Sequence, residues 1–538
     1  MSSSTIQSWF NNRLRDVAQF YESRDPQLYF SLNRCHISDP VASSTYVLPK
    51  DHKDGALKGR PIVSAVGGPS YELSKLMARV FKPLLRKIPS FIEDGDAFHS
   101  FINITDPSNV AYFGSFDVVN LYGSIPIHDT TECNGAITRL INFFNDNRGC
   151  TELGSILRVT DLRTLLELCF TTDHIIFDKK LYKQVFGLPM GNPLSPMAAI
   201  VYMSILEDFI FDRFQNSITW KRYIDDIFFI VHDSSILIDD LIYFINNLDT
   251  NISFTHEPAI NGCISFLDMS IKHFEQKFYT KLYIKELHSG TIVPYDSCVP
   301  KFIKRAIVFG ELRRAVHRAN TNLSKIESIN MVLKRFINNN YPTDFLLKCL
   351  VNFSNKHTNA LTTKEKKKNF LYIKLPFLND FFVFKMNKLL INCGLNSTIR
   401  FHFSAPSSLN QIFAPKKEKQ TCRTDCFYCT ISEQENICLL KNVIYRITCH
   451  ACSKLYIGET KRFLKTRIHE HLNKCTSAVL KHWRDMHSDK NINEIFSFNV
   501  LHTDLINTHK RQILEAFYIK SADNLLNDCE GLHTYLKF

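Results

Sequence analysis

Two adjacent aspartates between two apolar arms constrain the fold more than any other feature of this chain. Asp225 and Asp226 stand in the string WKRYIDDIFFIV, where aromatic and β-branched residues flank them on both sides. Such residues favour strands, so the string predicts a strand, a tight turn and a second strand. Carboxylates at one turn repel each other unless cations neutralise them, as in a two-metal phosphoryl-transfer site. The alternative is an exposed hairpin with an ordinary Asp-Asp turn.

A second apolar arm, further upstream, also ends in a carboxylate. In the string AYFGSFDVVNLYGSIPI, Asp117 follows the arm and Tyr122 comes five residues later. This pattern is typical of a metal-binding aspartate with an aromatic side chain beside the sugar of an incoming nucleotide. Between the two carboxylate segments lies FGLPMGNPLSP, which predicts a fixed backbone that a template or nucleotide can approach closely. An ordinary Pro/Gly loop is the alternative.

A basic segment precedes both carboxylates. The string LPKDHKDGALKGRPIVSA has two short extended arms around a turn. It can present Lys53, Lys58 and Arg60 to a triphosphate, although a solvated hairpin would look similar. The order of the parts is more informative than any one of them, because the basic hairpin, Asp-x4-Tyr, the Pro/Gly loop and Tyr-Ile-Asp-Asp precede ISFLDMSIK.

This ordered set resembles the reverse transcriptase domain over roughly residues 40–320. The strings PKDHK, GRPIVS, FDVVNLYGSIP, GLPMGNPLSP, RYIDDIFF and SFLDMSIK resemble Penelope-like elements more than retroviral enzymes. The resemblance implies that Asp117, Asp225 and Asp226 hold two Mg²⁺ ions, with Mn²⁺ as an alternative. It also implies that Tyr122 excludes a ribose 2′-hydroxyl.

The same resemblance extends to two further residues and a helical segment. Gln184, just before the Pro/Gly loop, and Lys272, after SFLD, are candidates for nucleotide positioning, with a plain surface role as the alternative. The segment 279–320 ends in a basic helical run that resembles a thumb. Its positive face would follow the backbone of a duplex.

The string NVIYRITCHACSKLYIGETKRFLKTRIHEHL holds a second group of candidate site residues. Two β-rich arms, VIYRI and LYIG, enclose a turn-like insert, and Arg467 and His471 then share a helix face at i and i+4. Together with Tyr445, Tyr456 and the downstream Glu515, this combination resembles the GIY-YIG nuclease fold.

The nuclease resemblance implies a role for each of these residues. Glu515 would hold one divalent ion, Mg²⁺, and Arg467 would stabilise charge on the scissile phosphate. Activation of water or positioning of the nucleophile would fall to Tyr445, Tyr456 or His471. Core packing is the alternative for the tyrosines.

Two positions qualify that resemblance. Val443 stands where the eponymous glycine would be, a change that Penelope-like proteins commonly tolerate. Asn527, in NLLNDCEG, is either a further site residue or a helix cap.

Cysteines and histidines in the same region have the spacing of zinc ligands. Cys449-x2-Cys452 precedes the Tyr-Ile-Gly arm and His482-x4-His487 follows the helix, so these four side chains can complete a tetrahedral Zn²⁺ site. Penelope-like endonucleases carry such a CCHH set in these places, which implies a structural ion. A second group predicts another zinc knuckle, with free buried thiols as the alternative. Its members are Cys422, Cys426, Cys429 and Cys438.

A chain of 538 residues exceeds a single ordinary core, so several domains are expected. The predicted fold is α+β and multidomain: a right-hand reverse transcriptase with fingers, palm and thumb, then a small α/β GIY-YIG nuclease domain with a zinc-binding insert. The predicted segments are an N-terminal helical segment (1–39), fingers and palm (40–275), a thumb-like helical region (276–354), a connector (355–420) and the Cys-rich nuclease domain (421–538). Relatives carry a longer region before PKDHK, so a truncated or compact N-terminus is expected.

Charge and hydropathy narrow the choice of partners. The formal charge of +12 favours a polyanion such as nucleic acid. The sequence lacks a run of about 18 apolar residues and begins without a secretory signal, so no membrane partner is expected. The protein is expected to work inside the cell, in the nucleus.

The predicted function is an RNA-directed DNA polymerase with a DNA-nicking endonuclease, acting in retrotransposition by target-primed reverse transcription. Its partners would be template RNA, primer or target DNA, and dNTPs, with the oligomeric state left open. The alternatives are a catalytically inactive or domesticated nucleic-acid-binding derivative and a telomerase-like polymerase. Retention of the three aspartates, Arg467 and Glu515 argues against an inactive derivative.

Overall fold

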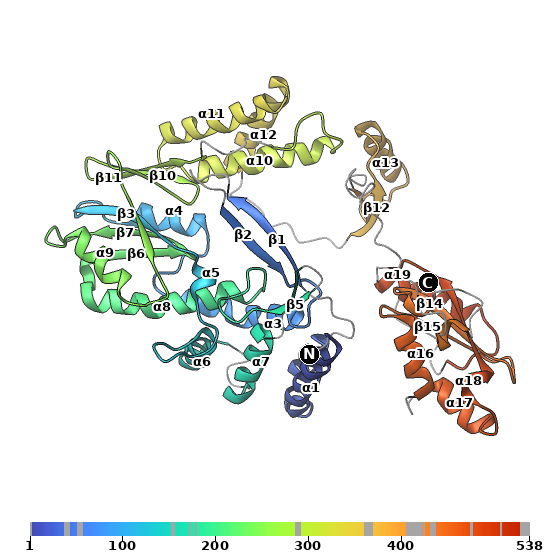
Figure 1. Ribbon diagram of the computed structural model, residues 1–538. Helices are drawn as coiled ribbons and strands as arrows, with labels where there is room; N and C mark the ends of the chain where they lie inside the picture. Colours follow the sequence, from blue (N-terminus) through green and yellow to red (C-terminus); the bar gives the residue numbers. More distant parts are fainter. Residues whose placement is uncertain are drawn as a thin grey trace. The chain divides into compact units, whose positions relative to one another are not determined.

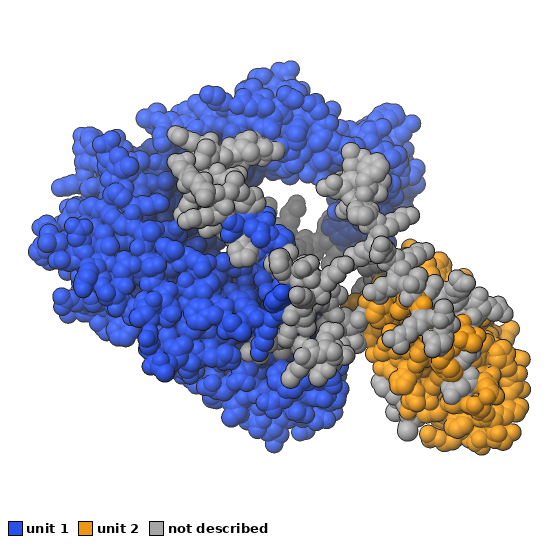
Figure 2. Space-filling model, viewed as in Figure 1, with its two compact units in different colours: residues 1–408 blue, residues 409–538 orange. Residues whose placement is uncertain are grey.

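The apolar arms of the sequence form strands in the computed structural model, and these strands belong to two units, residues 1–408 and residues 409–538 (Figure 2). The chain is thus a mixed α/β protein of more than one domain. None of the helices in the described parts is both long and apolar enough to cross a membrane. The structure describes residues 3–36, 43–50, 58–151, 156–171, 174–177, 180–285, 292–359, 370–404, 422, 426–430, 437–473, 477–505 and 508–527.

The centre of the first unit is a four-stranded antiparallel sheet in the order β6-β7-β3-β8. Successive side chains of a strand point to opposite faces. In β7, Ile227 and Phe229 therefore face one apolar cluster, and Phe228 and Ile230 face another. The strand is buried on both sides. The four strands are β3 (Tyr112–Val118), β6 (Ile218–Tyr223), β7 (Asp226–Val231) and β8 (Phe254–Pro258).

Helices cover both faces of this central sheet (Figure 1). On one face, α8 (Ser195–Phe214) contributes Met203 to the first cluster, and on the other, α4 (Gly95–Ile104) contributes Phe98 to the second. The other helices that supply the first cluster are α1 (Ser3–Tyr21), α2 (Pro26–Arg34), α3 (Tyr71–Phe81), α6 (Ala136–Asp146), α7 (Val159–Thr171) and α9 (Ile238–Asn246). Short helical turns are η1 (Leu84–Lys87), α5 (Leu121–Ser124), η2 (Arg148–Cys150) and η4 (Gln215–Ser217).

A buried ion pair ties α8 to the central sheet. The side chains of Arg222 in β6 and Glu207 in α8 are 0% and 1% exposed, and their charged groups approach to 2.5 Å. Glu207 also accepts hydrogen bonds from Ser90 Oγ at 2.5 Å and from Trp220 Nε1 at 3.0 Å. Buried charges are costly unless they are paired and hydrogen-bonded. This network therefore fixes β6 just before the Asp225 turn.

Two more sheets of the first unit precede its helical bundle. One has the order β2-β1-β4-β5, with β1 antiparallel to β2 and parallel to β4. The other has the order β11-β10-β9. Its strand β11 corrects the prediction of a helical region over 276–354, because Phe278, Thr280 and Leu282 are buried with the two-residue period of a strand. The strands are β1 (Ser43–Lys50), β2 (Lys58–Ser64), β4 (His174–Phe177), β5 (Lys180–Lys183), β9 (Cys263–Phe266), β10 (Met269–Phe274) and β11 (Lys277–Leu282).

A three-helix bundle follows these strands. It comprises α10 (Lys301–His317), α11 (Asn322–Asn338) and α12 (Thr343–Asn359), packed around Leu312, Val332 and Phe336. Arg318, at the end of α10, pairs with Asp96 of α4 and Asp268 before β10. The predicted connector then contains two parallel strands, β12 (Leu371–Pro376) and β13 (Ile399–Ser404), joined through α13 (Asp380–Asn392).

The second unit is built on a three-stranded antiparallel sheet in the order β15-β14-β16. The central strand is buried on both faces, since Tyr445 and Ile447 contact one apolar cluster and Ile444 contacts another. The strands are β14 (Val443–Cys449), β15 (Leu455–Thr460) and β16 (Phe496–His502). The helical segments are α15 (Phe427–Thr430), η5 (Ile437–Leu439), α16 (Leu464–Asn473), α17 (Ala478–Met486), α18 (Ile492–Ile495) and α19 (Thr508–Lys520).

Candidate catalytic centres

The hairpin β6-β7 confirms the strand, turn and strand predicted around the two aspartates. Tyr223 and Asp226 are register partners, so Ile224 and Asp225 form a two-residue turn. Ile224 has a φ of 57°, which such hairpin turns use but a β-branched residue adopts only at a cost. On the neighbouring strand β3, Asp117 lies opposite Asp226. The three predicted carboxylates therefore gather at one end of the central sheet.

Burial and mutual repulsion perturb this carboxylate group. Burial, followed by the charges of Asp225 and Asp117, raises the pKa of Asp226 to about 6. Glu257 adds to that rise in pKa and Lys285 opposes it. A bound cation would relieve the repulsion, so this set of oxygen donors fits a hard divalent cation such as Mg²⁺.

The three carboxylates line a cleft of about 1220 Å³, together with the Pro/Gly loop. This loop lies against β2, where the Val63 N–H donates to the Met190 carbonyl at 2.8 Å. A Cβ at Gly191 would overlap the carbonyl oxygen of Val63, and the φ of Gly191, 126°, is one that other residues rarely adopt. The glycine is therefore required to keep the loop against β2 at the edge of the cleft.

Tyr122 forms part of the same cleft wall. Its carbonyl accepts a hydrogen bond from the Leu188 N–H at 2.6 Å, which joins α5 to the Pro/Gly loop. Burial, and then the charge of Asp225, raises the pKa of Tyr122 to about 12. Its hydroxyl therefore stays protonated, and the ring offers an apolar wall next to the carboxylates.

The other predicted nucleotide-binding residues are placed differently. Gln184 donates its amide hydrogens to the Phe186 and Gly187 carbonyls at 3.1 and 2.9 Å and so stabilises the start of the Pro/Gly loop. It is not among the residues that line the cleft. Lys272 is exposed on β10, its ammonium 5.3 Å from the ring of Phe274, and does not line the cleft either. Lys53 lies outside the described residues, as do the side chains of Lys58 and Arg60.

Two charged residues of the cleft were not singled out from the sequence. Lys285 and Glu257 both line it, although neither belongs to a recognisable motif. Glu257 reaches it because β8 pairs with β3, and Lys285 reaches it from the segment after β11. Only the tertiary fold brings them to the carboxylates.

In the second unit, Tyr445 connects β14 to two side chains of α16. Its hydroxyl accepts a hydrogen bond from Arg467 Nε at 3.2 Å and lies 2.8 Å from His471 Nε2. Nδ1 of His471 lies 3.1 Å from the Ser477 hydroxyl oxygen. Burial, and then the charge of Arg467, lowers the pKa of His471 to about 3. The imidazole is therefore neutral at pH 7, and Nε2 accepts the tyrosine hydrogen when the ring hydrogen is on Nδ1.

The two predicted tyrosines differ in their access to solvent. Tyr445 is fully buried, whereas Tyr456 on β15 is only partly buried. The Tyr456 ring packs edge-on against His471, with their centroids 4.6 Å apart. Water can therefore reach Tyr456 but not Tyr445.

Gly458 is the glycine of the Tyr-Ile-Gly string, and it faces Tyr445 across the sheet. A Cβ at Gly458 would lie 2.5 Å from the tyrosine oxygen, so a larger residue would displace the tyrosine. Val443, which replaces the eponymous glycine, is fully buried in the apolar cluster with Ile447 and fills the core. The departure from the family pattern thus leaves the tyrosine in place.

Glu515 of α19 lies beside a second carboxylate and two arginines. It accepts a hydrogen bond from the Glu459 N–H at 3.0 Å. Burial, and then the charge of Glu459, raises the pKa of Glu515 to about 7, while Arg467 and Arg511 oppose that rise. Arg511 is 1% exposed, pairs with the Glu459 carboxylate and donates to the Leu505 carbonyl at 2.6 Å.

Sequence patterns assigned no role to Glu459 or Arg511, although Glu459 lies in the string that carries the nuclease resemblance. The available signal was the i, i+4 spacing of Arg511 and Glu515 on one helix. Asn527, considered as a site residue or a helix cap, pairs with the backbone of β15: its amide donates to the Ile457 carbonyl at 2.7 Å and accepts from the Ile457 N–H at 3.0 Å.

The predicted CCHH set comes together. The ligand atoms of Cys449, Cys452, His482 and His487 all lie within 4.8 Å of one another. Cys452 Sγ is 3.2 Å from His482 Nε2, and Nε2 of His487 is buried without a hydrogen-bond partner among the described residues. Backbone N–H groups of Ala451 and Cys452 point to the Cys449 sulfur, as in a zinc knuckle. The donor set fits Zn²⁺.

Comparison with known proteins supports part of this description. Residues 441–524 match the model of the GIY-YIG catalytic domain, so the chain carries a GIY-YIG domain at its C-terminal end, as predicted. Residues 291–350, which contain α10 and α11 and part of α12, match that of the animal helix-turn-helix domain. No curated protein matches the chain.

Among solved structures, the chain is similar to two telomerases in complex with a TWJ fragment of telomeric RNA. The telomerase from Candida albicans is 12% identical, with a TM-score of 0.39 and 59% of this chain covered. The telomerase from Candida tropicalis is 13% identical, with a TM-score of 0.35 and 60% of this chain covered. The chain spans 61% and 56% of the lengths of these telomerase chains.

Proposed function

We propose that this chain is an RNA-directed DNA polymerase joined to a DNA-nicking endonuclease, and that it acts by target-primed reverse transcription in retrotransposition. The observation that carries the proposal is the meeting of Asp117, Asp225 and Asp226 at one cleft in a chain that also has a GIY-YIG domain. A nick made by the nuclease would supply the 3′-hydroxyl that the polymerase extends on an RNA template. The substrates would be template RNA, target DNA and dNTPs.

In the polymerase, Asp117, Asp225 and Asp226 would hold two Mg²⁺ ions, or Mn²⁺ in their place. Such ions would lower the pKa of the primer 3′-hydroxyl and stabilise the leaving pyrophosphate. The chain itself positions the reactants. Tyr122 would exclude a 2′-hydroxyl by bulk, and Lys285 would add positive charge on the triphosphate side of the cleft.

The helical bundle would hold the product duplex next to this cleft. Lys301, Arg305 and Arg313 are exposed on α10, with spacings of four and eight residues that place them along one side of the helix. Contacts between such cations and phosphates are insensitive to base sequence and weaken with salt. This assignment agrees with the predicted thumb, and the match to a helix-turn-helix domain covers the same helices.

In the nuclease, Glu515 would hold one divalent ion, and Arg467 would stabilise charge on the scissile phosphate. Tyr456 would contact the attacking water, because Tyr445 is fully buried. The neutral His471 keeps the Tyr445 hydroxyl oriented toward Arg467, which fixes the guanidinium. The CCHH set would hold a structural zinc ion that joins the end of β14 to α17.

Two assays on the full chain in Mg²⁺ test this function. One measures extension of a DNA primer on an RNA template, and the other measures nicking of supercoiled plasmid. We expect Asp225→Ala to abolish extension and keep nicking, and Glu515→Ala to do the reverse, so each variant controls for the folding of the other.

Other outcomes would select an alternative function. Wild-type protein that is folded but inert in both assays would indicate a nucleic-acid-binding derivative. Extension without nicking would indicate a polymerase of the telomerase kind, which starts from an existing end.

A further inference from the structure

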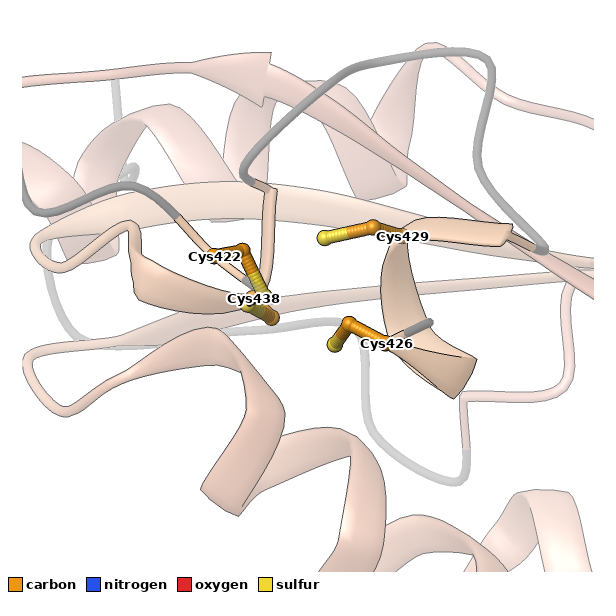
Figure 3. Close-up of side chains that lie close together, drawn as sticks. All are labelled: Cys422, Cys426, Cys429 and Cys438. Atoms are coloured by element: carbon orange, nitrogen blue, oxygen red, sulfur yellow. Dashed lines mark hydrogen bonds between the residues drawn. The ribbon is translucent and has the colours of Figure 1, made fainter. Parts of the chain in front are cut away.

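Four thiols in the second unit converge from two short segments. Cys426 directly precedes α15 and Cys429 lies within it, Cys438 belongs to η5, and Cys422 lies upstream (Figure 3). Their sulfur atoms all lie within 4.8 Å of one another. The Cys438 thiol donates to Cys422 Sγ at 3.0 Å, well beyond a disulfide bond length of about 2.05 Å. The group is therefore a set of four thiols, without a disulfide between them, that share one centre.

The Cys426-x2-Cys429 segment has the backbone of a metal knuckle. The Cys429 N–H donates to the Cys426 carbonyl at 2.9 Å, which closes a tight turn. The N–H groups of Tyr428 and Cys429 also point to the Cys426 sulfur. Cys449-x2-Cys452 shows the same backbone pattern.

Buried cysteines elsewhere in the chain are placed differently. Cys35, Cys169 and Cys349 each lie among the aliphatic and aromatic side chains of a core cluster. The four thiols instead contact one another, and three of them are only partly buried. Four sulfurs gathered in this way, with a knuckle turn, are typical of a tetrahedral thiolate site, which zinc favours.

The segment that carries these thiols packs on the helix with the catalytic arginine. Ile437, next to Cys438, is fully buried in one cluster with Ile468 of α16. The Leu464 N–H at the start of α16 donates to the Leu440 carbonyl at 2.8 Å. Tyr428 of the knuckle places its hydroxyl 3.4 Å from Nδ1 of His469 in α16. The knuckle and η5 thus contact the start and the middle of α16.

We propose that Cys422, Cys426, Cys429 and Cys438 bind one zinc ion, separate from the CCHH set, and that this ion fixes the position of α16 and thereby of Arg467. Binding converts up to four thiols to thiolates and releases their protons to solvent, with no change of redox state. Metal binding stands independently of the chain's activity, whereas the positioning role rests on the proposed nuclease function.

The first test is the zinc content of the full-length protein, measured by mass spectrometry of the metal after removal of loosely bound ions. We expect two zinc ions per chain, one after Cys426→Ser with Cys429→Ser, and one after His482→Ala with His487→Ala. Cys393→Ser, which changes an exposed cysteine of the other unit, should keep both ions. The proposal would be overturned if the wild type held only one zinc ion and the Cys426→Ser, Cys429→Ser variant still held it. A Cys422–Cys438 disulfide in the native protein would also overturn it.

The second test concerns α16. Loss of the four-thiol ion should lower the kcat for nicking by up to about 100-fold, because small misplacements of a catalytic group are costly. The KM for DNA and primer extension should stay unchanged, and hydrogen exchange should rise in residues 464–473 but not in β14. Cys422→His, which keeps a zinc ligand, should retain the second ion and most of the nicking. Nicking at the wild-type rate without this ion would refute the positioning role and leave the metal count as evidence on the site itself.

Discussion

The two candidate centres handle a buried carboxylate in opposite ways. Asp226 lies near three other carboxylates, with Lys285 opposing their effect, whereas Glu515 lies beside one carboxylate and two arginines. The first centre therefore depends on external cations to neutralise it, which suits two metal ions. The second centre supplies part of its own positive charge, which suits one. The centre with less positive charge of its own is thus the one proposed to use more metal ions.

The largest expected difference is in stability, and it comes from the buried ion pair that supports each centre. Arg222→Met would leave Glu207 charged and fully buried, so we expect a loss of about 3–5 kcal/mol in the stability of the first unit. Arg511→Met should cost less in the second unit, about 1–3 kcal/mol, because Glu459 is 23% exposed and can be hydrated. Hydrogen exchange resolved along the full chain would measure both. Equal losses would show that burial does not set the difference.

The next effect is steric and separates the two activities. Gly191→Ala should lower primer extension, and Gly458→Ala should lower nicking, each by roughly 10- to 100-fold, because the added Cβ displaces the loop or Tyr445. Each variant should keep the activity of the other unit. Gly310→Ala is the matched control, since a Cβ there meets no neighbour within 4 Å. A loss of both activities in either variant would point to global misfolding.

The pH dependence should differ between the centres. A carboxyl whose pKa is higher in the folded chain than in the unfolded chain binds its proton more tightly when folded. Its contribution to stability is therefore fully present below the unfolded pKa and is lost as pH rises through the folded pKa. For the metal-free chain, the stability of the first unit should fall as pH rises from about 3.8 to 6, because Asp226 loses its proton there. The stability of the second unit should fall as pH rises from about 4.5 to 7, because Glu515 does the same.

Mg²⁺ titrations of the two activities would reveal this difference. A metal competes with the proton, so the Mg²⁺ requirement should rise roughly tenfold per pH unit below the relevant pKa. The rise should begin near pH 7 for nicking and near pH 6 for extension. Identical onsets would contradict the electrostatic contrast between the centres.

The smallest effect concerns the lysines near the nucleotide. Lys285→Ala should raise the KM for dNTP by roughly two- to fivefold, because an exposed charge pair contributes little in water. Lys272→Ala should leave that KM unchanged, since Lys272 does not line the cleft. An effect of Lys272 as large as that of Lys285 would restore the role that the sequence resemblance implied for it.

Local patterns were enough to predict the features that short segments determine. The meeting of Cys449 and Cys452 with His482 and His487 was expected from the family resemblance, because about 30 residues separate the two pairs. The hairpin at Asp225, the helix with Arg467 and His471 and each C-x2-C turn follow instead from strand-forming residues and from short spacings. These are properties of neighbours in sequence. They required no knowledge of how distant elements pack.

Features that depend on distant contacts could not be predicted. Arg222 and Glu207 are fifteen residues apart and become a pair only when α8 packs on the sheet. Glu459 meets Arg511 because α19 packs on β15. The error at β11 is of another kind: this strand pairs with its neighbour β10 across a two-residue turn, so the predicted helical region began a few residues too early. The roles predicted for Gln184 and Lys272 stay predictions, since their motifs are near the cleft in sequence but their side chains are not among those that line it.

The most direct test of the central claim combines both reactions on one substrate. Supercoiled plasmid, an RNA template whose 3′ end can anneal at the nick, and labelled dNTPs are incubated with the full chain in Mg²⁺, and label joined covalently to the plasmid is measured. We expect incorporation by the wild type, none by Glu515→Gln unless the plasmid is nicked beforehand, and none by Asp225→Asn on either plasmid. Incorporation by Asp225→Asn, or failure of the pre-nicked plasmid to rescue Glu515→Gln, would contradict two separate catalytic centres in one chain.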